Sequence, residues 1–171
     1  KEFSKILIEQ IDTMKDVANA FSDFAALPEA KLKHLDIVEI SRRSLEIFEQ
    51  IKIVFTSSHP KIFVNLDRTQ WVRVMTNLIQ NGIQSVPAES KVELKVEIKK
   101  LMKEVQIHFS DNGVGISKSI KDKIFEPKFT TKTKGMGLGL GIVKNIVNSH
   151  GGKIDYSSSS KGTKFTITLK I

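Results

Sequence analysis

The sequence predicts an α+β fold, a two-layer α/β sandwich: a mixed sheet of about five strands with helices on one face, preceded by one long stalk helix. Along the chain, segments with a helical spacing of apolar residues are followed by short segments in which apolar and polar residues alternate. The 171 residues suffice for one domain of ordinary size plus an appendage. The chain has no cysteine, which excludes disulfide scaffolds, thiolate metal sites and cysteine nucleophiles.

The N-terminal segment 3–27 contains neither Gly nor Pro and predicts a long helix. Its apolar residues follow a heptad spacing: Leu7, Ile11, Met14, Ala18, Phe21 and Ala25. We expect this helix to pack in a bundle with a helix outside this chain; the alternative is an amphipathic helix lying on its own domain. Pro28 ends the helix. We therefore divide the chain into a stalk segment 1–28, a linker 29–36 and a domain 37–171.

The domain alternates helices and strands. In order, we expect a helix over 37–51, strands over 52–57 and 62–66, a helix from its cap Asp67 to about Val86, strands over 91–99 and 105–110, a helix over 138–149, and strands over 153–157 and 163–171. The last two strands form a hairpin, and Gly151 and Gly152 are positioned to cap the preceding helix. Residues 117–136 lack strong periodicity, which is typical of a lid or a disordered loop.

Lys and Arg number 27 against 19 Asp and Glu, a formal net charge of +8. A basic surplus suits an anionic partner such as the phosphates of a nucleotide. The lysines are dispersed, and one Trp and one Tyr make no aromatic ladder, so we expect no nucleic-acid partner. No apolar run approaches the roughly 18 residues of a membrane span. Because residue 1 is Lys, we expect the chain to be a piece of a longer protein.

Two asparagines, Asn77 and Asn81, lie one turn apart inside a predicted helix, where Asn is a poor residue. Carboxamide oxygens suit a Mg²⁺ ion that takes its charge balance from phosphates, although two surface asparagines are the simpler interpretation. The run from Asp111 to Gly115 follows an apolar strand. Its glycines permit close approach of a ligand, and its carboxylate could accept a hydrogen bond from an exocyclic amine; a plain turn is the alternative.

Four alternate glycines, Gly135 to Gly141, open the helix near the C-terminus. A glycine-rich helix start exposes N–H donors suited to phosphates. The spacing fits neither the dinucleotide G-x-G-x-x-G nor the P-loop motif, so it excludes both folds. Between these motifs, the segment 124–132 carries two phenylalanines that could anchor a lid, with hydroxyls and lysines that could reach phosphates.

In this order, N-x-x-x-N, D-x-G-x-G, F-x-x-x-F with T-T-K, and G-x-G-L-G-L resemble the N, G1, F and G2 boxes of sensor histidine kinases. The resemblance covers about residues 35–171 and is to their ATP-binding catalytic domain, in the superfamily shared with type II topoisomerases, Hsp90 and MutL. The segment 1–28 resembles the second helix of the dimerisation and phosphoacceptor domain. Its ending, 21–28, is similar to nitrogen-regulation kinases of the NtrY type.

The resemblance implies that Asp111 binds the adenine amine, that Asn81 with Asn77 binds Mg²⁺, and that the other boxes bind phosphates and anchor the lid. The implied ATP-binding set is Asn77, Asn81, Asp111, Gly113, Gly115, Ile116, Phe125, Phe129, Thr130, Thr131, Lys132, Gly135, Gly137, Leu138, Gly139, Leu140 and Thr163. None is assigned a catalytic role. Gly82 stands where Ala is usual after the second Asn, and Lys170 where Pro often closes the last strand.

The hydrolysing branches place a Glu general base at the position of Asn77, and an amide cannot take that role, so phosphoryl transfer is favoured over hydrolysis. The four histidines do not match a phosphoacceptor site, so we expect the acceptor His outside this chain. The resemblance implies relay to the Asp of a response regulator receiver domain, a phosphoacceptor helix in the same or a partner subunit, a homodimer, and a cytoplasmic domain of a membrane-anchored protein. An ATP hydrolase and a non-catalytic ATP-binding module remain alternatives.

Overall fold

The computed structural model describes residues 11, 28–126 and 137–171. The main strands are β2 (Ile53–Ser57), β4 (Leu94–Lys100), β5 (Glu104–Asp111), β6 (Lys153–Ser159) and β7 (Gly162–Lys170). The helices are α2 (Ile37–Leu45), α3 (Arg68–Ser85) and α4 (Gly139–Ser149), with short 3-10 turns η1 (Glu46–Phe48) and η2 (Lys118–Ile120). Two further strands, β1 (Lys33–Asp36) and β3 (Phe63–Leu66), pair with each other.

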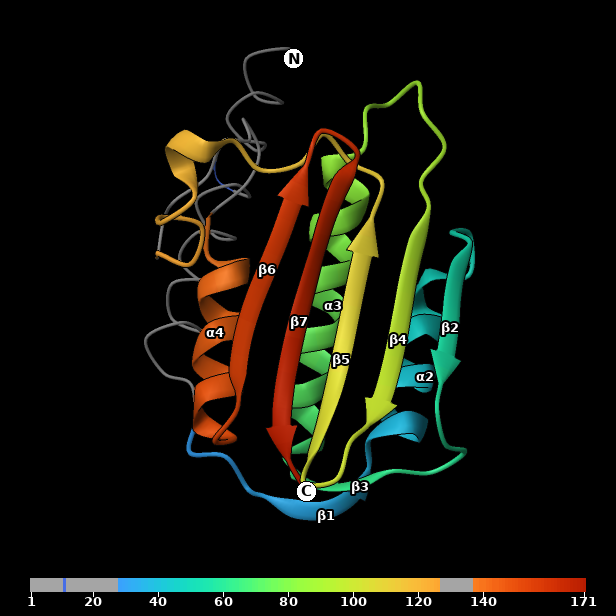
Figure 1. Cartoon of the computed structure of the whole chain (residues 1–171), viewed down its shortest axis with the longest axis vertical. Coiled ribbons are helices and arrows are strands. Elements are labelled where there is room, and N and C mark those ends of the chain that lie inside the picture. Colours follow the sequence, from blue (N-terminus) through green and yellow to red (C-terminus); the bar gives the residue numbers. More distant parts are fainter. Residues whose placement is uncertain (1–10, 12–27, 127–136) are drawn as a thin grey trace.

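The main sheet is mixed and has the order β2-β4-β5-β7-β6. β2 runs parallel to β4, and the other neighbouring strands are antiparallel. The described helices α2, α3 and α4 lie behind the sheet in Figure 1, so they cover one of its faces. The expected five-stranded mixed sheet with helices on one face is confirmed, including the C-terminal hairpin of β6 and β7.

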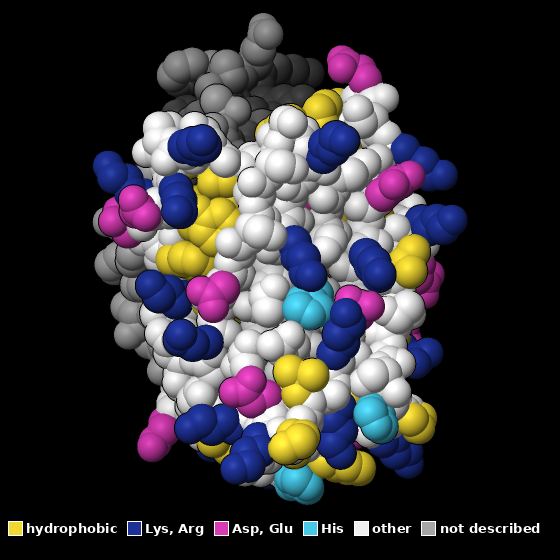
Figure 2. Space-filling model, in the orientation of Figure 1, with side chains coloured by type: hydrophobic (Ala, Val, Ile, Leu, Met, Phe, Trp, Pro, Cys, Tyr) yellow, Lys and Arg dark blue, Asp and Glu magenta, His cyan; other side chains and the backbone are white. Residues whose placement is uncertain are grey.

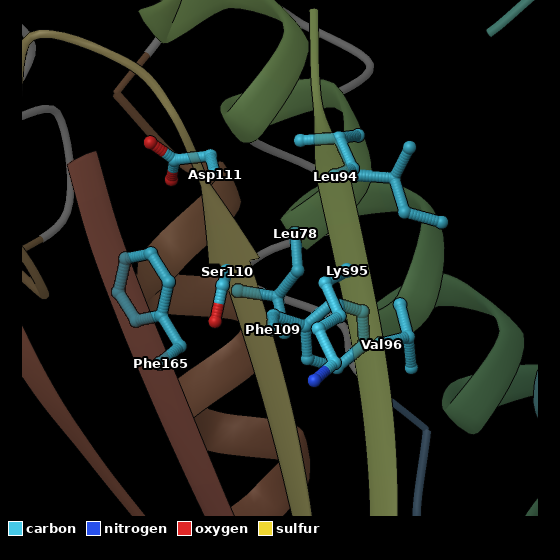
Figure 3. Close-up of a pocket in the computed structure, with 9 residues that line it drawn as sticks. Leu78, Leu94, Lys95, Val96, Phe109, Ser110, Asp111 and Phe165 are labelled. Atoms are coloured by element: carbon cyan, nitrogen blue, oxygen red, sulfur yellow. The ribbon is translucent and has the colours of Figure 1, made fainter. Parts of the chain in front are cut away.

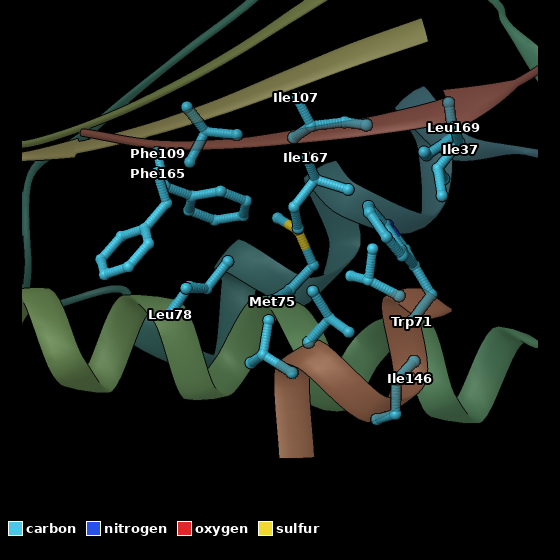
Figure 4. Close-up of a cluster of buried hydrophobic side chains, with 14 of the residues drawn as sticks. Ile37, Trp71, Met75, Leu78, Ile107, Phe109, Ile146, Phe165, Ile167 and Leu169 are labelled. Atoms are coloured by element: carbon cyan, nitrogen blue, oxygen red, sulfur yellow. The ribbon is translucent and has the colours of Figure 1, made fainter. Parts of the chain in front are cut away.

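The core lies between the sheet and the helices (Figure 4). Alternate residues of the central strands point into it, and Ile98, Ile107 and Ile167 are fully buried. Trp71 and Met75 of α3 meet them from the helical layer and are fully buried as well. Burying a large apolar side chain contributes about 1.5–3 kcal/mol, so this layer fixes the position of α3 under the sheet.

Helix α2 is joined to α3 by one polar contact inside this core. The indole Nε1 of Trp71 donates a hydrogen bond to Ser41 Oγ at 3.0 Å, and both residues have no exposed surface. A buried indole N–H without an acceptor costs about 1–3 kcal/mol, so Ser41 provides the partner that lets Trp71 occupy the core.

The opposite face of the sheet carries polar and charged side chains of both signs (Figure 2). His108 of β5 lies on it, only 8% exposed, with Nδ1 3.1 Å from Thr166 Oγ1. Burial lowers the pKa of His108, and the nearby Lys164 and Lys99 lower it further, against an opposing effect of Glu97. The neutral imidazole is therefore favoured in the folded protein.

The last four residues of the predicted linker 29–36 form the strand β1. Asp36 explains why a strand stops there: its side chain accepts from Val38 N and Ile62 N, which caps α2 and ties it to the residue before β3. The start of the linker is also fixed, since Gln70 Nε2 of α3 donates to Pro28 O at 2.8 Å. Polar composition alone predicted no such contacts.

The helix expected over 37–51 is shorter than predicted. It leaves α-helical geometry after Leu45 and continues as η1, whose tighter turn is common at helix ends. The cap of the next helix is confirmed: Asp67 Oδ1 accepts from Gln70 N at 3.1 Å. The helix expected over 3–27 lies outside the described residues apart from Ile11, so its packing and the division at residue 28 stay predictions.

The end of α4 contacts the start of α3 through His150. Its Nδ1–H donates to Ile146 O at 2.7 Å, so its Nε2 accepts from the Asp67 backbone N–H at 3.0 Å. Gly151 follows with a φ of +68°, which confirms the predicted helix end. Among the described residues, no helix is both long and apolar enough to cross a membrane.

Candidate nucleotide-binding site

The site begins at Asp111, the last residue of β5, at the rim of a small apolar pocket bordered by Leu78, Phe109 and Phe165 (Figure 3). One carboxylate oxygen, Oδ1, accepts from Gly113 N at 2.9 Å, from Thr163 N at 3.2 Å and from Ser85 Oγ at 3.2 Å. The other oxygen, Oδ2, accepts no hydrogen bond from any described residue. It is therefore available to a donor on a ligand.

Thr163 lies beside Asp111, because it is the residue of β7 whose N–H reaches the carboxylate. Its side chain is buried, with Oγ1 3.0 Å from Ser158 Oγ. The same serine hydroxyl accepts from Ile116 N at 2.8 Å. Ser158 thus joins the turn after Asp111 to the hairpin of β6 and β7.

The glycines of this turn are required by close backbone approaches. Gly115 has a φ of +77°, and a Cβ built on it would lie 2.0 Å from Ser159 O. Gly113 has a different neighbour: a Cβ there would lie 2.0 Å from Ser85 Oγ. Since real Cβ contacts do not come so close, both positions admit only glycine unless the backbone moves.

The two asparagines of α3 face the glycine-rich start of α4. A Cβ built on Gly139 would lie 2.9 Å from Asn77 Oδ1 and 3.6 Å from Asn81 Nδ2. Asn77 is oriented by its own helix, because its Nδ2 donates to Arg73 O at 2.8 Å. The structure therefore brings together two motifs that lie about sixty residues apart in the sequence.

Among the described residues, Asn81 carries a buried polar atom without a hydrogen-bond partner. Its Nδ2 is shielded from solvent and makes no hydrogen bond in the described part of the chain. A buried amide is normally satisfied, so an orphaned one points to a missing ligand. A half-turn of the amide would place Oδ1 at the same point, and a carboxamide oxygen is a suitable Mg²⁺ ligand. Asn81 therefore fits the metal that the resemblance implies.

The start of α4 can receive anions. Leu138 precedes the helix, and its side chain makes no capping hydrogen bond to the first N–H groups. The Leu138 side chain is buried in the core, which leaves its backbone for a ligand, and Gly137 before it has a φ of +66°. Together with the dipole of an eleven-residue helix, these N–H groups favour phosphate.

Phe125 is one of the two phenylalanines expected to anchor a lid, and it packs on the body of the domain. Its ring meets Tyr156 of β6 edge-on at 6.1 Å, and Lys144 Nζ of α4 lies 5.4 Å from its centroid. Burial raises the pKa of Tyr156, and Asp122 raises it further, so its neutral hydroxyl donates to Lys121 O. Five further predicted site residues lie outside the described residues: Phe129, Thr130, Thr131, Lys132 and Gly135.

Sequence reasoning missed two serines of the site, Ser85 and Ser158. A signal for Ser85 existed, since it follows Asn77 and Asn81 at the same four-residue spacing and so continues their face of the helix. Ser158 belongs to a run of four serines that offered no way to single it out. No group of three His, Asp or Glu side chains placed to hold a metal occurs within residues 28–126 and 137–171.

Comparison with known proteins gives one consistent result. Residues 66–171 match the model of the histidine kinase-, DNA gyrase B-, and HSP90-like ATPases. A putative NtrY-like sensor histidine kinase of Rickettsia bellii is 30% identical over 166 residues, which are 95% of this chain and 27% of that protein. Sensor histidine kinase ZraS of Escherichia coli is 29% identical, over 99% of this chain and 38% of its own length.

A solved structure gives the same answer for the fold. The catalytic domain of histidine kinase ThkA, in a nucleotide-free form, matches with a TM-score of 0.74 and 30% identity, over 82% of this chain and 95% of that one. The chain thus spans 27–38% of the two curated relatives above but nearly all of a catalytic domain. The chain belongs to the family of histidine kinase-, DNA gyrase B-, and HSP90-like ATPases.

Proposed function

We propose that this chain is the ATP-binding kinase domain of a two-component sensor histidine kinase. In this role it binds Mg-ATP and donates the γ-phosphoryl group to a His outside the chain, for relay to an Asp of a response regulator. The observation that carries the proposal is the approach of Gly139 to Asn77 and Asn81, which places a candidate cation ligand beside a helix start suited to phosphates.

In the proposed complex, Asp111 Oδ2 accepts from the exocyclic amine of adenine. Guanine carries a carbonyl oxygen at that position, which would leave two acceptors facing each other and the carboxylate unpaired. Thr163 and Gly113 fix the carboxylate through their backbone N–H groups. Adenine is thus selected by one oxygen whose partner oxygen is already occupied.

The triphosphate would lie between α3 and the start of α4. Asn81, oriented beside Asn77, would hold Mg²⁺, and the first N–H groups of α4 would bind phosphate oxygens. Mg²⁺, when bound, supplies charge neutralisation on the phosphates. These residues would position the phosphates and stabilise their charge, and these two effects account for most of the catalysis of phosphoryl transfer.

The reaction proposed for the whole protein transfers the phosphoryl group from the β-γ bridging oxygen of ATP to an imidazole nitrogen, with ADP as the leaving group. Water is a poor competitor, because the position of a general base is taken by Asn77. The acceptor His would come from a phosphoacceptor helix of the same or a partner subunit in a homodimer. A membrane anchor would also lie outside this chain.

The test of the proposal is calorimetric titration of the chain with ADP and Mg²⁺, comparing Asp111→Asn with Asp155→Asn. Asp155 lies on an exposed position of β6, so its variant is the matched control for loss of one carboxylate. We expect Asp111→Asn to weaken ADP binding strongly and Asp155→Asn to retain it. Unchanged affinity in Asp111→Asn would refute base recognition at this site.

The transfer step has its own test. Incubated with γ-labelled ATP, the chain alone should acquire no acid-labile label, whereas the full-length protein should acquire it on a His. Label on a histidine of this chain would contradict an acceptor elsewhere. Steady release of inorganic phosphate would instead support an ATP hydrolase. Nucleotide binding without label on the full-length protein would support a non-catalytic ATP-binding module.

A further inference from the structure

Ser85, the last residue of α3, is enclosed by the turn that follows Asp111. Its Oγ lies 3.2 Å from Asp111 Oδ1, and its carbonyl accepts from Val114 N at 3.1 Å. A Cβ on Gly113 would lie 2.0 Å from Ser85 Oγ and 2.8 Å from Ser85 O. The end of α3 and the turn are therefore in close contact through both backbone and side chain.

The hydroxyl of Ser85 has one proton and two acceptors. Oγ is 2.7 Å from Gly82 O and 3.2 Å from Asp111 Oδ1, so the proton is shared between them. The remaining donors to Oδ1 are backbone N–H groups of Gly113 and Thr163. Within the described residues, Ser85 is thus the one side chain that donates to this carboxylate.

We propose that Ser85 is a positioning residue for base recognition, which keeps Asp111 Oδ2 directed at the amine of the bound base. The inference rests on the proposed function, because Ser85 matters only if Asp111 binds that amine. Two backbone donors fix one side of Oδ1, and Ser85 approaches from α3. Without the third donor, the carboxylate can rotate about χ2 and lose its alignment with the base.

Removing the hydroxyl should misalign the hydrogen bond between Asp111 Oδ2 and the amine of the base. We expect the affinity for ADP to fall about threefold to tenfold. The loss should be confined to ligands that carry the amine. A purine riboside diphosphate, with hydrogen in place of the amine, gains nothing from Asp111 and should bind the wild-type chain and the variant equally. A general weakening of the pocket would instead affect both ligands.

The experiment is calorimetric titration of the 171-residue chain with ADP and with purine riboside diphosphate, for wild type and three variants. Ser85→Ala tests the inference, Asp111→Asn removes the base-reading carboxylate, and Ser90→Ala is a matched control on an exposed loop. We expect wild type and Ser90→Ala to prefer ADP equally. Asp111→Asn should lose the preference, and Ser85→Ala should reduce it threefold to tenfold through ADP alone.

Different outcomes overturn the proposed function and the role of Ser85. If wild type does not prefer ADP, base recognition by Asp111 fails and the proposed function with it. A second outcome is that wild type prefers ADP, Asp111→Asn loses this preference, and Ser85→Ala keeps it in full. In that case only the inference about Ser85 is overturned. Equal weakening of both ligands in Ser85→Ala also overturns it. Should Ser85→Ala not fold, as seen by circular dichroism, Ser85→Cys retains the shape with a weaker donor, and an undiminished preference there overturns the inference.

Discussion

Gly139→Ala should separate stability from nucleotide binding. Gly139 is the first residue of α4 and does not have a positive φ, so alanine adopts its backbone conformation without strain. In a helix interior, alanine is favoured over glycine by about 1 kcal/mol, and at the first position we expect part of that gain. The added methyl, however, would lie 2.9 Å from Asn77 Oδ1.

The size of the effect follows from that distance. Carbon and carbonyl oxygen come no closer than about 3.3 Å even in weak C–H···O contacts, so the Asn77 amide must move by about 0.4 Å. Its hydrogen bond to Arg73 O opposes the movement. Because a contact to a charged group contributes about 1.5–3 kcal/mol and the displaced amide keeps only part of it, we expect Mg-ATP affinity to fall roughly tenfold.

The assay is calorimetric titration with Mg-ATP beside thermal unfolding of the same samples. We expect weaker binding with an unchanged or slightly higher melting temperature. In the background of Asn77→Ala the contact is absent, so Gly139→Ala should then raise the melting temperature by its full helix gain. Binding of Gly139→Ala with wild-type affinity would refute the convergence of the two motifs on the ligand.

Three further predictions concern stability. Ser41→Ala leaves the buried indole N–H of Trp71 without an acceptor, so urea unfolding followed by fluorescence of this one Trp should show a loss of about 1–3 kcal/mol; no loss would mean another acceptor takes over. Gly115→Ala requires a positive φ at alanine against Ser159 O, so it should lower the melting temperature by several degrees, and an unchanged value would contradict the tight turn. The pKa of His108 is lower in the folded than in the unfolded chain, so the unfolded chain binds more protons. The contribution of His108 to stability is full above the usual pKa of 6.5 and is lost as pH falls towards the folded value. A fall in unfolding free energy from pH 7.5 to 5.5 that is as steep in His108→Gln as in wild type would exclude this cause.

Most helices and strands of the described residues could be predicted from the sequence, because local signals are strong in this chain. Asp67 caps its helix as its side-chain chemistry predicts, and the alternation of apolar and polar residues located both central strands. The sequence did not predict the strand at 33–36, since β1 forms only by pairing with β3, about thirty residues away. A short strand with a polar sequence has no local signal of its own.

For the site, residue types and their order were enough to predict a nucleotide pocket: paired asparagines, an acid after a strand, and a glycine-rich helix start are local patterns with recognisable chemistry. Only the tertiary structure decided which atoms of these residues are hydrogen-bonded. Within the described part of the chain, Asp111 Oδ1 is occupied and Oδ2 accepts no hydrogen bond because α3, β5 and β7 meet at that point, and Asn81 Nδ2 has no partner beside the start of α4. Hydrogen-bond occupancy depends on neighbours brought together by packing, and a linear pattern does not contain those neighbours.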